Sequence, residues 1–301
     1  MIFNWRGYLK IVGVYVDIIE EFIIEKYFIY LENSMVSKDR ERVLKANNLK
    51  KILCKGKAMF LAYDQGLEHG PDSDFNSKNV DPLFIIDIAK KGKYTGIVFH
   101  KGIASKYARE IKKAGVPLIV KLNGKTSLHK GEPVSRPVCS VIEAKELNAS
   151  AVGYTLYIGS DYEAVMFEDF DKIVHDAKHL GLPVICWIYP RGKSVKNDVS
   201  REMISYAART GLELGADIVK LKYGGKSGDL KWAVRSAGRA KVVVAGGTKK
   251  DDNEFLRQVK EIIKSGAIGL AVGRNVWQNK DPLKISGNIR KIIFDRKISN
   301  A

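Results

Sequence analysis

The sequence of 301 residues has few cysteines and no long apolar run, and each shortage excludes a class of protein. Its three cysteines, Cys54, Cys139 and Cys186, show no paired spacing, which argues against a disulfide framework and against a zinc motif. This use of cysteine fits a reducing, cytoplasmic location. No uninterrupted apolar run approaches the ~20 residues that a membrane-spanning helix needs, so no membrane association is expected.

Acidic residues are also scarce relative to basic ones. The chain has 34 Asp and Glu against 51 Lys and Arg, a formal net charge of +17, which attracts anions such as nucleic acid or phosphorylated metabolites. The lysines are spread evenly, without a basic tail, an arginine-rich run or an interleaved aromatic patch. This pattern favours a solvated, lysine-rich surface, and no nucleic-acid partner is expected.

Residues 1–34 differ in composition from the rest of the chain. They are aromatic and β-branched, but charged residues interrupt them, among them Asp17, Glu20 and Lys26. They also lack the small-residue cleavage site that follows the apolar core of a signal peptide. Met35 opens a second, conventional start. We therefore expect a helical N-terminal extension or a mis-assigned start over 1–34, of unclear role, and a single domain over 35–301.

From about residue 58 the chain alternates short apolar runs with amphipathic helical patterns. Several of these patterns, such as 81–92, 105–115, 200–215 and 252–266, close with glycine, the expected C-terminal stop of a helix. Continuous apolar strands that alternate with helices predict a covered parallel sheet. Eight such units favour a closed (β/α)8 TIM barrel, with an N-terminal helical extension, over an open doubly wound sheet. The predicted strands are 58–64, 95–102, 117–124, 151–159, 183–192, 217–225, 241–247 and 268–274.

The sixth strand, DIVKLKYGG, carries two lysines near its C-terminal end, where a barrel of this type has its chemistry. Lys220 and Lys222 are two residues apart, so their side chains point to the same face. Burial and a second nearby cation both push a lysine toward its neutral form, which can form a Schiff base with a carbonyl substrate. The alternative is a structural lysine paired with a carboxylate, or a Lys222 that reaches solvent. Two lysines on the same face of the strand, followed by two glycines, favour a catalytic role over a structural one.

The first and fifth strands end in further candidates. Asp64 follows the first strand, where a carboxylate can hold or move a proton, although a loop-capping aspartate has the same position. Trp187, Tyr189 and Arg191 share one parity and would line the mouth of the barrel together. The tyrosine can donate a proton if a neighbouring cation holds its pKa near the working range, and the arginine offers a fork of donors to phosphate. Core packing with a surface charge is the alternative.

Glycine turns end the seventh and eighth strands, at Gly246–Gly247 and Gly273–Arg274. Glycine lets backbone N–H groups approach an anion closely, and phosphate binding after these two strands recurs in barrels of this type. We therefore expect a phosphate site here, with tight turns alone as the alternative. The longest irregular stretch, residues 123–136, follows the third strand and is a candidate active-site loop.

Six motifs, YDQGLEHGP, KLNGKTSL, WIYPRGK, IVKLKYGG, VVAGG and AVGRNVWQ, resemble in this order those of the archaeal-type class I fructose-bisphosphate aldolases, the DhnA-type family. The similarity runs from Ala58 to Gln278 and implies a barrel that forms a Schiff base without a metal or another cofactor. By motif, the resemblance gives Lys220 the Schiff-base role, Tyr189 the role of proton donor and Asp64 that of the first-strand aspartate. It places phosphate or substrate contacts at Gly246, Gly247, Gly273, Arg274, His69, Trp187 and Arg191, with Lys222 expected beside Arg191.

The resemblance implies reversible cleavage of fructose 1,6-bisphosphate to dihydroxyacetone phosphate and glyceraldehyde 3-phosphate in glycolysis and gluconeogenesis. It also implies a cytoplasmic, ring-based homo-oligomer such as a decamer. A related branch, the 2-amino-3,7-dideoxy-D-threo-hept-6-ulosonate synthases, shares the lysine, the tyrosine and the glycine turns, so this and related sugar-phosphate aldolase or transaldolase activities are alternatives. Gln65, where a histidine is frequent, leaves some substrate contacts open. A non-enzymatic barrel that binds a phosphate ligand or nucleic acid is the alternative from a different class.

Overall fold

A computed structural model describes residues 38–295, so the expected extension over residues 1–34 lies outside the described residues. The chain divides into two compact units, Met1–Val43 and Leu44–Ala301. Residues 38–52 form a helix that precedes the first strand. All of the strands belong to the larger unit.

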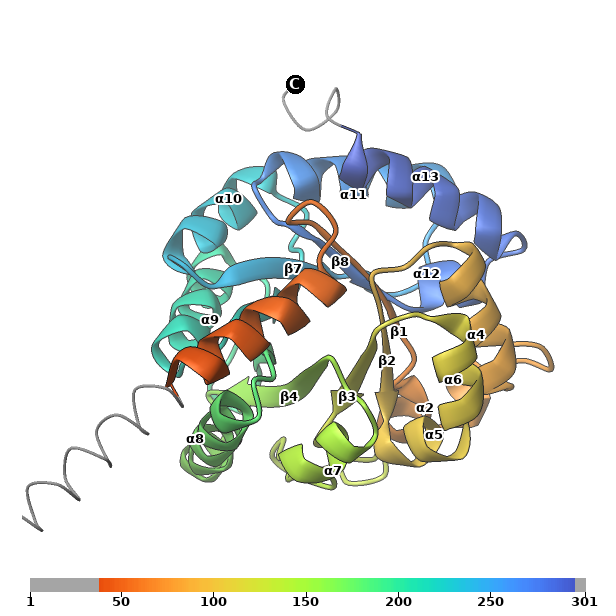
Figure 1. Cartoon of the computed structure of the whole chain (residues 1–301). Helices are drawn as coiled ribbons and strands as arrows, with labels where there is room; N and C mark the ends of the chain where they lie inside the picture. Colours follow the sequence, from red (N-terminus) through yellow and green to blue (C-terminus); the bar gives the residue numbers. More distant parts are fainter. Residues whose placement is uncertain (1–37, 296–301) are drawn as a thin grey trace, which may run out of the picture. The chain divides into compact units, whose positions relative to one another are not determined.

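Eight parallel strands form one closed barrel, in which each strand pairs with its neighbours in the sequence and β8 pairs with β1 (Figure 1). The predicted (β/α)8 fold is therefore confirmed. Each predicted run contains one strand but extends beyond it, into a loop or into the start of the next helix. The strands are β1 (Ala58–Ala62), β2 (Gly96–His100), β3 (Leu118–Lys121), β4 (Ala151–Ile158), β5 (Val184–Pro190), β6 (Ile218–Leu221), β7 (Lys241–Ala245) and β8 (Gly269–Val272).

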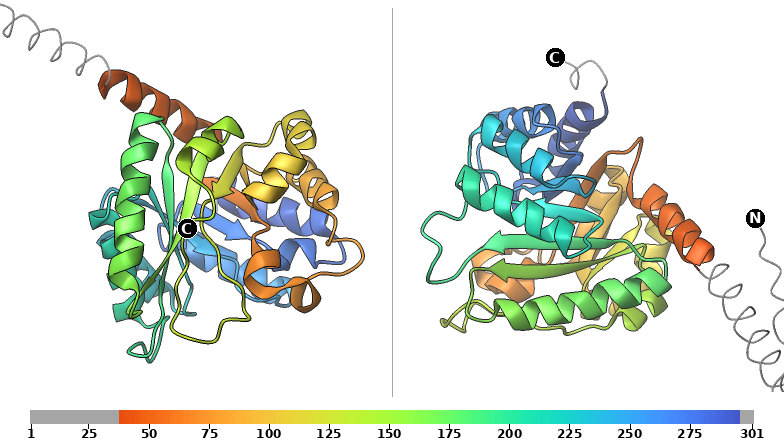
Figure 2. Two further views of the ribbon diagram at one scale, coloured as in Figure 1. Left: turned by 90° about the horizontal axis from the view of Figure 1, so that it is seen from below. Right: turned by 90° about the vertical axis from the view of Figure 1, so that its left-hand side faces the viewer.

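Helices surround the strands on the outside of the barrel (Figure 2). Their starts follow local chemistry: the side chain of Ser200 accepts a hydrogen bond from the backbone N–H of Met203 at the start of α9, and Asp251 caps α11 in the same way. The predicted helix over 105–115 is broken at Tyr107 into α5 and α6. The helices after β1 are α2 (Gln65–His69), α3 (Pro71–Asp74), α4 (Pro82–Lys91), α5 (Lys101–Lys106), α6 (Ala108–Ala114), α7 (Val141–Glu146), α8 (Glu163–His179), α9 (Arg201–Glu213), α10 (Ser227–Ser236), α11 (Asp252–Lys264), α12 (Arg274–Trp277) and α13 (Pro282–Phe294).

Apolar side chains fill the barrel interior toward the N-terminal ends of the strands. Phe60 and Ile218, from opposite sides of the barrel, belong to this interior cluster, and Ile52 from the preceding helix is fully buried in it. Leu49 and Leu53 pack against the same cluster, and Asn48 Nδ2 donates to the carbonyl oxygen of Gly181 at 2.8 Å. The N-terminal end of the barrel is therefore closed, which leaves the C-terminal strand ends for a site. Over residues 38–295, no helix is both long and apolar enough to cross a bilayer.

Candidate active site

A cavity of about 670 Å³ opens at the C-terminal ends of the strands. Every residue that the sequence predicts for the site lines this cavity. These residues are Asp64, His69, Trp187, Tyr189, Arg191, Lys220, Lys222, Gly246, Gly247, Gly273 and Arg274.

Lys220 lies inside the barrel on β6, with 6% of its surface exposed. Its register partner on β5 is Trp187, and its Nζ atom lies 5.0 Å from the centroid of that ring. Within the described residues it has no hydrogen bond or ion pair. The indole fits because Gly153 on β4 has no side chain: a Cβ atom there would lie 1.8 Å from the Trp187 ring. A glycine on one strand and a tryptophan on the next thus form the environment of this lysine.

A second buried lysine, Lys121 at the end of β3, faces the same cavity. Its Nζ atom lies 3.1 Å from Asp64 Oδ2 and 2.6 Å from Glu68 Oε1, and 3% of its side chain is exposed. Burial alone would neutralise such an ammonium, but the two carboxylates outweigh it and raise the pKa of Lys121 above its ordinary value. The buried side chains of Asp64 and Lys121 and the partly buried side chain of Glu68 form a cluster with two carboxylates and one ammonium.

Burial lowers the pKa of Lys220 to about 8, with Lys121 adding to this effect and the Asp64 and Glu68 carboxylates opposing it. The sequence reading assigned the neighbouring cation to Lys222, which is wrong: the cation that acts on Lys220 is Lys121. Asp64 behaves oppositely, because burial would raise its pKa but Lys121 and Lys220 hold it below its usual range. At neutral pH the site therefore combines an ionised carboxylate with a lysine that is partly uncharged.

Tyr189 on β5 and Tyr157 on β4 are register partners, and both line the cavity. Burial raises the pKa of Tyr157 to about 12, and burial with the nearby carboxylates raises that of Tyr189 well above its ordinary value. Arg191 lies 5.3 Å from the centroid of the Tyr157 ring and opposes both shifts without cancelling them. The expected cationic lowering of the Tyr189 pKa is therefore not found, and the phenol keeps its proton over the physiological range.

Lys222 follows the last residue of β6 and lines the cavity on the same side as Lys220, as the strand alternation predicts. Its Nζ atom lies 5.7 Å from the centroid of the Tyr189 ring and forms an ion pair with Asp198. Asp198 belongs to the segment between β5 and α9. Lys222 thus connects this segment to the end of β6.

His69 and Arg274 reach the cavity from opposite ends of the sequence and share one partner, Asp74. The Nδ1 atom of His69 lies 2.5 Å from Asp74 Oδ2, and Arg274 Nη1 lies 3.4 Å from Asp74 Oδ1. Asp74 is buried, with 8% exposed. Its carboxylate therefore orients two groups at the rim of the cavity.

The glycine turns after β7 and β8 face the cavity. Gly247 has φ +75°, a conformation that residues with a side chain rarely adopt. A Cβ atom at Gly273 would lie 2.8 Å from the carbonyl oxygen of Ala62, so the adjacent strand leaves no room for one. Glycine is therefore required at Gly247 by the backbone conformation and at Gly273 by the close approach of the neighbouring strand, and the space around the Gly247 Cα atom is open.

The irregular stretch after β3 is anchored beside the barrel. Asn123 is fully buried; its Nδ2 donates to the carbonyl oxygens of Ser135 and Thr155, and its Oδ1 accepts from the N–H of Thr155. The structure describes every residue of this stretch, and none of residues 124–136 lines the cavity. The expectation of an active-site loop here is not supported.

Lys121 is the main residue that the sequence reading missed. It lies inside the apolar run PLIVKLNG, so the signal that selected Lys220, a lysine within a buried strand, was also present there. Glu68 and Asp74 were not assigned, because Lys121 and Arg274, with which they form ion pairs, lie far away in the sequence. Across residues 38–295, no group of three or more His, Cys, Asp or Glu side chains is placed to hold a metal ion.

Known aldolases are similar to this chain over the length of the barrel. The family model for DeoC/LacD family aldolases matches residues 58–279. The class 1 fructose-bisphosphate aldolase of Thermoproteus tenax is 48% identical over 246 residues, which are 81% of this chain and 92% of that protein. The fructose-bisphosphate aldolase/6-deoxy-5-ketofructose 1-phosphate synthase of Methanocaldococcus jannaschii is 39% identical over 258 residues, 81% of this chain and 83% of that protein.

A solved structure is also similar, that of an archaeal fructose-1,6-bisphosphate aldolase with its catalytic lysine covalently bound to the carbinolamine intermediate of the substrate. It is 45% identical, with a TM-score of 0.78, and the match covers 83% of this chain and 99% of that one. The resemblance seen in the sequence motifs is thus confirmed over the whole barrel, and the chain belongs to the DeoC/LacD family of aldolases.

Proposed function

We propose that this protein is a class I aldolase that reversibly cleaves fructose 1,6-bisphosphate through a Schiff base on Lys220. One observation carries the assignment to Lys220: a buried lysine with a lowered pKa faces the cavity at the C-terminal end of the barrel. The family and the activities named for its relatives support the reaction class.

In the proposed first step, the neutral Lys220 amine attacks the ketone carbon to give a carbinolamine. Loss of water then gives an iminium, which carries a positive charge while its nitrogen is protonated. Because Asp64, Glu68 and Lys121 together leave one excess negative charge beside Lys220, the site is electrically balanced when the iminium is present. Such a site stabilises the charged intermediate more than the neutral amine.

Cleavage then needs a group to accept the proton of the C4 hydroxyl as the C3–C4 bond breaks and its electrons move into the iminium. The low pKa of Asp64 keeps this carboxylate ionised. It can therefore accept a hydrogen bond from the C4 hydroxyl and orient that group for cleavage. Tyr189 keeps its proton and is therefore suited to act as a proton donor. It would give the proton to the departing water during dehydration and, after cleavage, to the enamine carbon. Hydrolysis of the resulting iminium releases dihydroxyacetone phosphate and the free amine.

The two phosphates would bind at opposite ends of the cavity. The backbone of Gly246, Gly247 and Gly273, with the guanidinium of Arg274, forms one site. Arg191 and Lys222 form the other, where a phosphate would compete with Asp198 for the ammonium of Lys222. Binding at both ends positions the ketone carbon against Lys220.

A second sugar-phosphate reaction is a candidate for the same site, because the relative from Methanocaldococcus jannaschii is named for two activities. The heptulosonate synthase activity stays an alternative as well. All of these reactions use the Schiff-base lysine, so a panel of phosphorylated ketones and aldehydes distinguishes them. Nucleic-acid binding that is sensitive to salt and survives Lys220→Ala would instead favour a binding protein.

Borohydride trapping tests the proposal. Incubation with fructose 1,6-bisphosphate and borohydride should give an adduct on the peptide that contains Lys220, and chelators should leave cleavage unchanged. Lys220→Met should lose the adduct and the activity, whereas the matched variant Lys222→Met should keep the adduct on Lys220. An adduct on another lysine, or none, contradicts the proposed mechanism. The homo-oligomer, the cytoplasmic location and the division at residue 35 stay predictions.

A further inference from the structure

We propose that Asn275 is a positioning residue that shapes the anion-binding turn after β7, a role that rests on the proposed phosphate site. Asn275 belongs to α12, directly after Arg274, and has 1% of its surface exposed. Its side chain reaches from the end of β8 to the turn after β7. It therefore joins the two segments that would hold the same phosphate.

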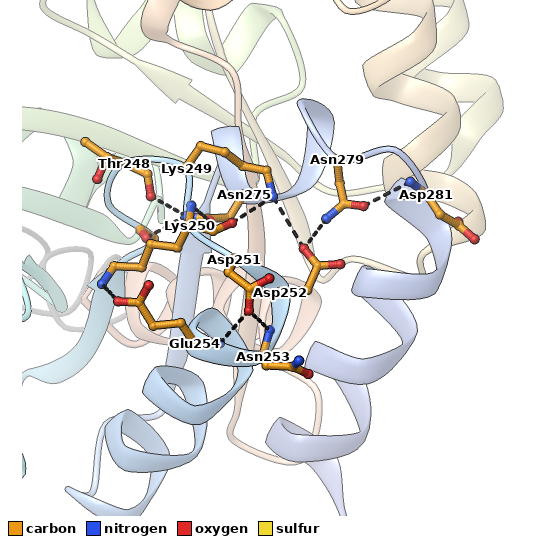
Figure 3. Close-up of polar contacts among 11 residues, drawn as sticks. Thr248, Lys249, Lys250, Asp251, Asp252, Asn253, Glu254, Asn275, Asn279 and Asp281 are labelled. Carbon is orange, nitrogen blue, oxygen red and sulfur yellow. Dashed lines mark hydrogen bonds and ion pairs between the residues drawn. The ribbon is translucent and has the colours of Figure 1, made fainter.

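The carboxamide of Asn275 makes three hydrogen bonds to the backbone of this turn. Its Nδ2 donates to the carbonyl oxygens of Gly246 at 3.0 Å and Thr248 at 2.8 Å, and its Oδ1 accepts from the N–H of Lys250 at 2.9 Å. Figure 3 shows the side chain beside Thr248 and Lys250 at the centre of this network. Both donor hydrogens of the amide are thus used within the turn.

These bonds determine which way the turn presents its N–H groups. In a trans peptide the C=O and the N–H of the same unit point in opposite directions. With the carbonyls of Gly246 and Thr248 directed at Asn275, the N–H groups of Gly247 and Lys249 point away from it. In the part of the chain that the structure describes, the N–H groups of Gly247, Thr248 and Lys249 donate to no other residue.

An inorganic or ester phosphate accepts hydrogen bonds from N–H groups arranged in this way. Gly247 lines the cavity, so its N–H both points away from Asn275 and belongs to a residue where such a group would bind, and Thr248 lines the cavity beside it. If the Asn275 amide is removed, the carbonyls of Gly246 and Thr248 are free to turn toward the cavity, where they would repel the phosphate. Asn275 therefore acts on the ligand through the backbone, without contacting it.

The test compares Asn275→Leu, which keeps the approximate volume without a polar group, with Asn279→Ala. Asn279 belongs to the outer part of the same network and donates to Asp252, but it bonds to neither carbonyl of the turn. In the first measurement, inorganic phosphate is titrated and the shift in Tm is followed. We expect half-saturation to need about tenfold more phosphate in Asn275→Leu, the effect of losing oriented N–H donors, and no change in Asn279→Ala.

The second measurement uses borohydride trapping with dihydroxyacetone phosphate and with dihydroxyacetone. We expect the half-saturating concentration to rise about tenfold for the phosphorylated ketone alone, with the limiting rate of trapping kept. An equal loss for both ketones, or phosphate binding as in the wild type, would overturn the assignment of Asn275. If the leucine variant does not fold, Asn275→Ser replaces it in both measurements. The serine hydroxyl can donate a hydrogen bond to one of the two carbonyl oxygens.

The two measurements separate this inference from the proposed function. A wild-type protein that forms no adduct with either ketone contradicts the Schiff-base proposal, and the phosphate titration still decides the role of Asn275. A wild-type protein that binds no phosphate overturns the role of Asn275, whatever the trapping shows.

Discussion

The Nζ atom of Lys220 lies 5.0 Å from the centroid of the Trp187 ring, its register partner on the neighbouring strand. This contact depends on Gly153, which leaves the space that the indole fills. Three adjacent strands, β4, β5 and β6, thus supply the gap, the ring and the lysine in that order.

Gly153→Ala should disturb this arrangement. The new Cβ atom would lie 1.8 Å from the Trp187 ring, so the indole or the strand must move. We expect a loss of about 1–3 kcal/mol in the free energy of unfolding, typical of overpacking, together with slower trapping of substrate. Denaturant unfolding and the rate of borohydride trapping measure the two effects. Gly287→Ala in α13 is the control: its Cβ meets nothing within 4 Å, and a gain of up to about 1 kcal/mol is expected.

Adduct formation on Lys220 should increase with pH through about 8 and then level, because the neutral amine is the nucleophile and burial lowers the pKa of Lys220 to about 8. Initial trapping rates from pH 6 to 10 measure this dependence. A rate that still climbs steeply above pH 10 would mean that Lys220 has the pKa of an exposed lysine.

The same shift has a consequence for folding. Because the pKa of Lys220 is lower in the folded than in the unfolded chain, the unfolded chain binds more protons between about pH 8 and the ordinary lysine pKa near 10.5. The contribution of Lys220 to the free energy of unfolding therefore increases over this pH window. Denaturant unfolding over this window should show the free energy of unfolding of the wild type rising with pH relative to that of Lys220→Met.

Lys121→Met should move the pH dependence of trapping to higher pH. The variant removes a cation that lowers the pKa of Lys220 and leaves the carboxylates of Asp64 and Glu68, which raise it. Lys222→Met is the matched control and should leave the midpoint in place, since Lys222 is paired with Asp198. Asp64→Asn should move the midpoint the opposite way. Equal midpoints in all three variants would show that the cluster does not act on Lys220.

Asn123→Ala should destabilise the protein by about 2–4 kcal/mol, because it leaves the buried N–H of Thr155 and two carbonyl oxygens without their partner. Thermal unfolding measures the loss. Asn253→Ala, at an exposed position whose side chain makes no hydrogen bond to another described residue, should change stability by less than about 0.5 kcal/mol.

The eight strands could be predicted because a strand buried on both faces reads as a continuous apolar run. Strand alternation also predicted correctly that Lys220 and Lys222 face the cavity, as do Trp187 and Tyr189. The predicted ends of the strands were less accurate. The glycine and polar residues that follow each strand continue its sequence pattern, so the predicted runs are too long. The expected helix over 105–115 is interrupted at Tyr107, a break that its periodicity does not show.

The partners of the charged residues could not be predicted, because they depend on barrel closure. Lys121 and Lys220 are about 100 positions apart, on strands separated by two others, and only the closed barrel directs both into one interior. The pKa shifts of Lys220 and Tyr189 follow first from burial in this interior and then from the charged groups that the barrel brings close to them. The stretch 123–136 was expected at the active site because it is the longest irregular one. Its length does not show whether it lies over the cavity or beside the barrel.

The closed N-terminal end of the barrel, with Ile52 buried among the strands, has a kinetic consequence. Ligands must enter and leave through the same mouth. In the proposed mechanism the aldehyde product departs while the ketone half is still covalently attached to Lys220, so release would be ordered, with the aldehyde first and the ketone second. In the synthetic direction the order reverses, and an aldehyde that occupies the mouth too early would block the ketone and appear as an inhibitor at high concentration.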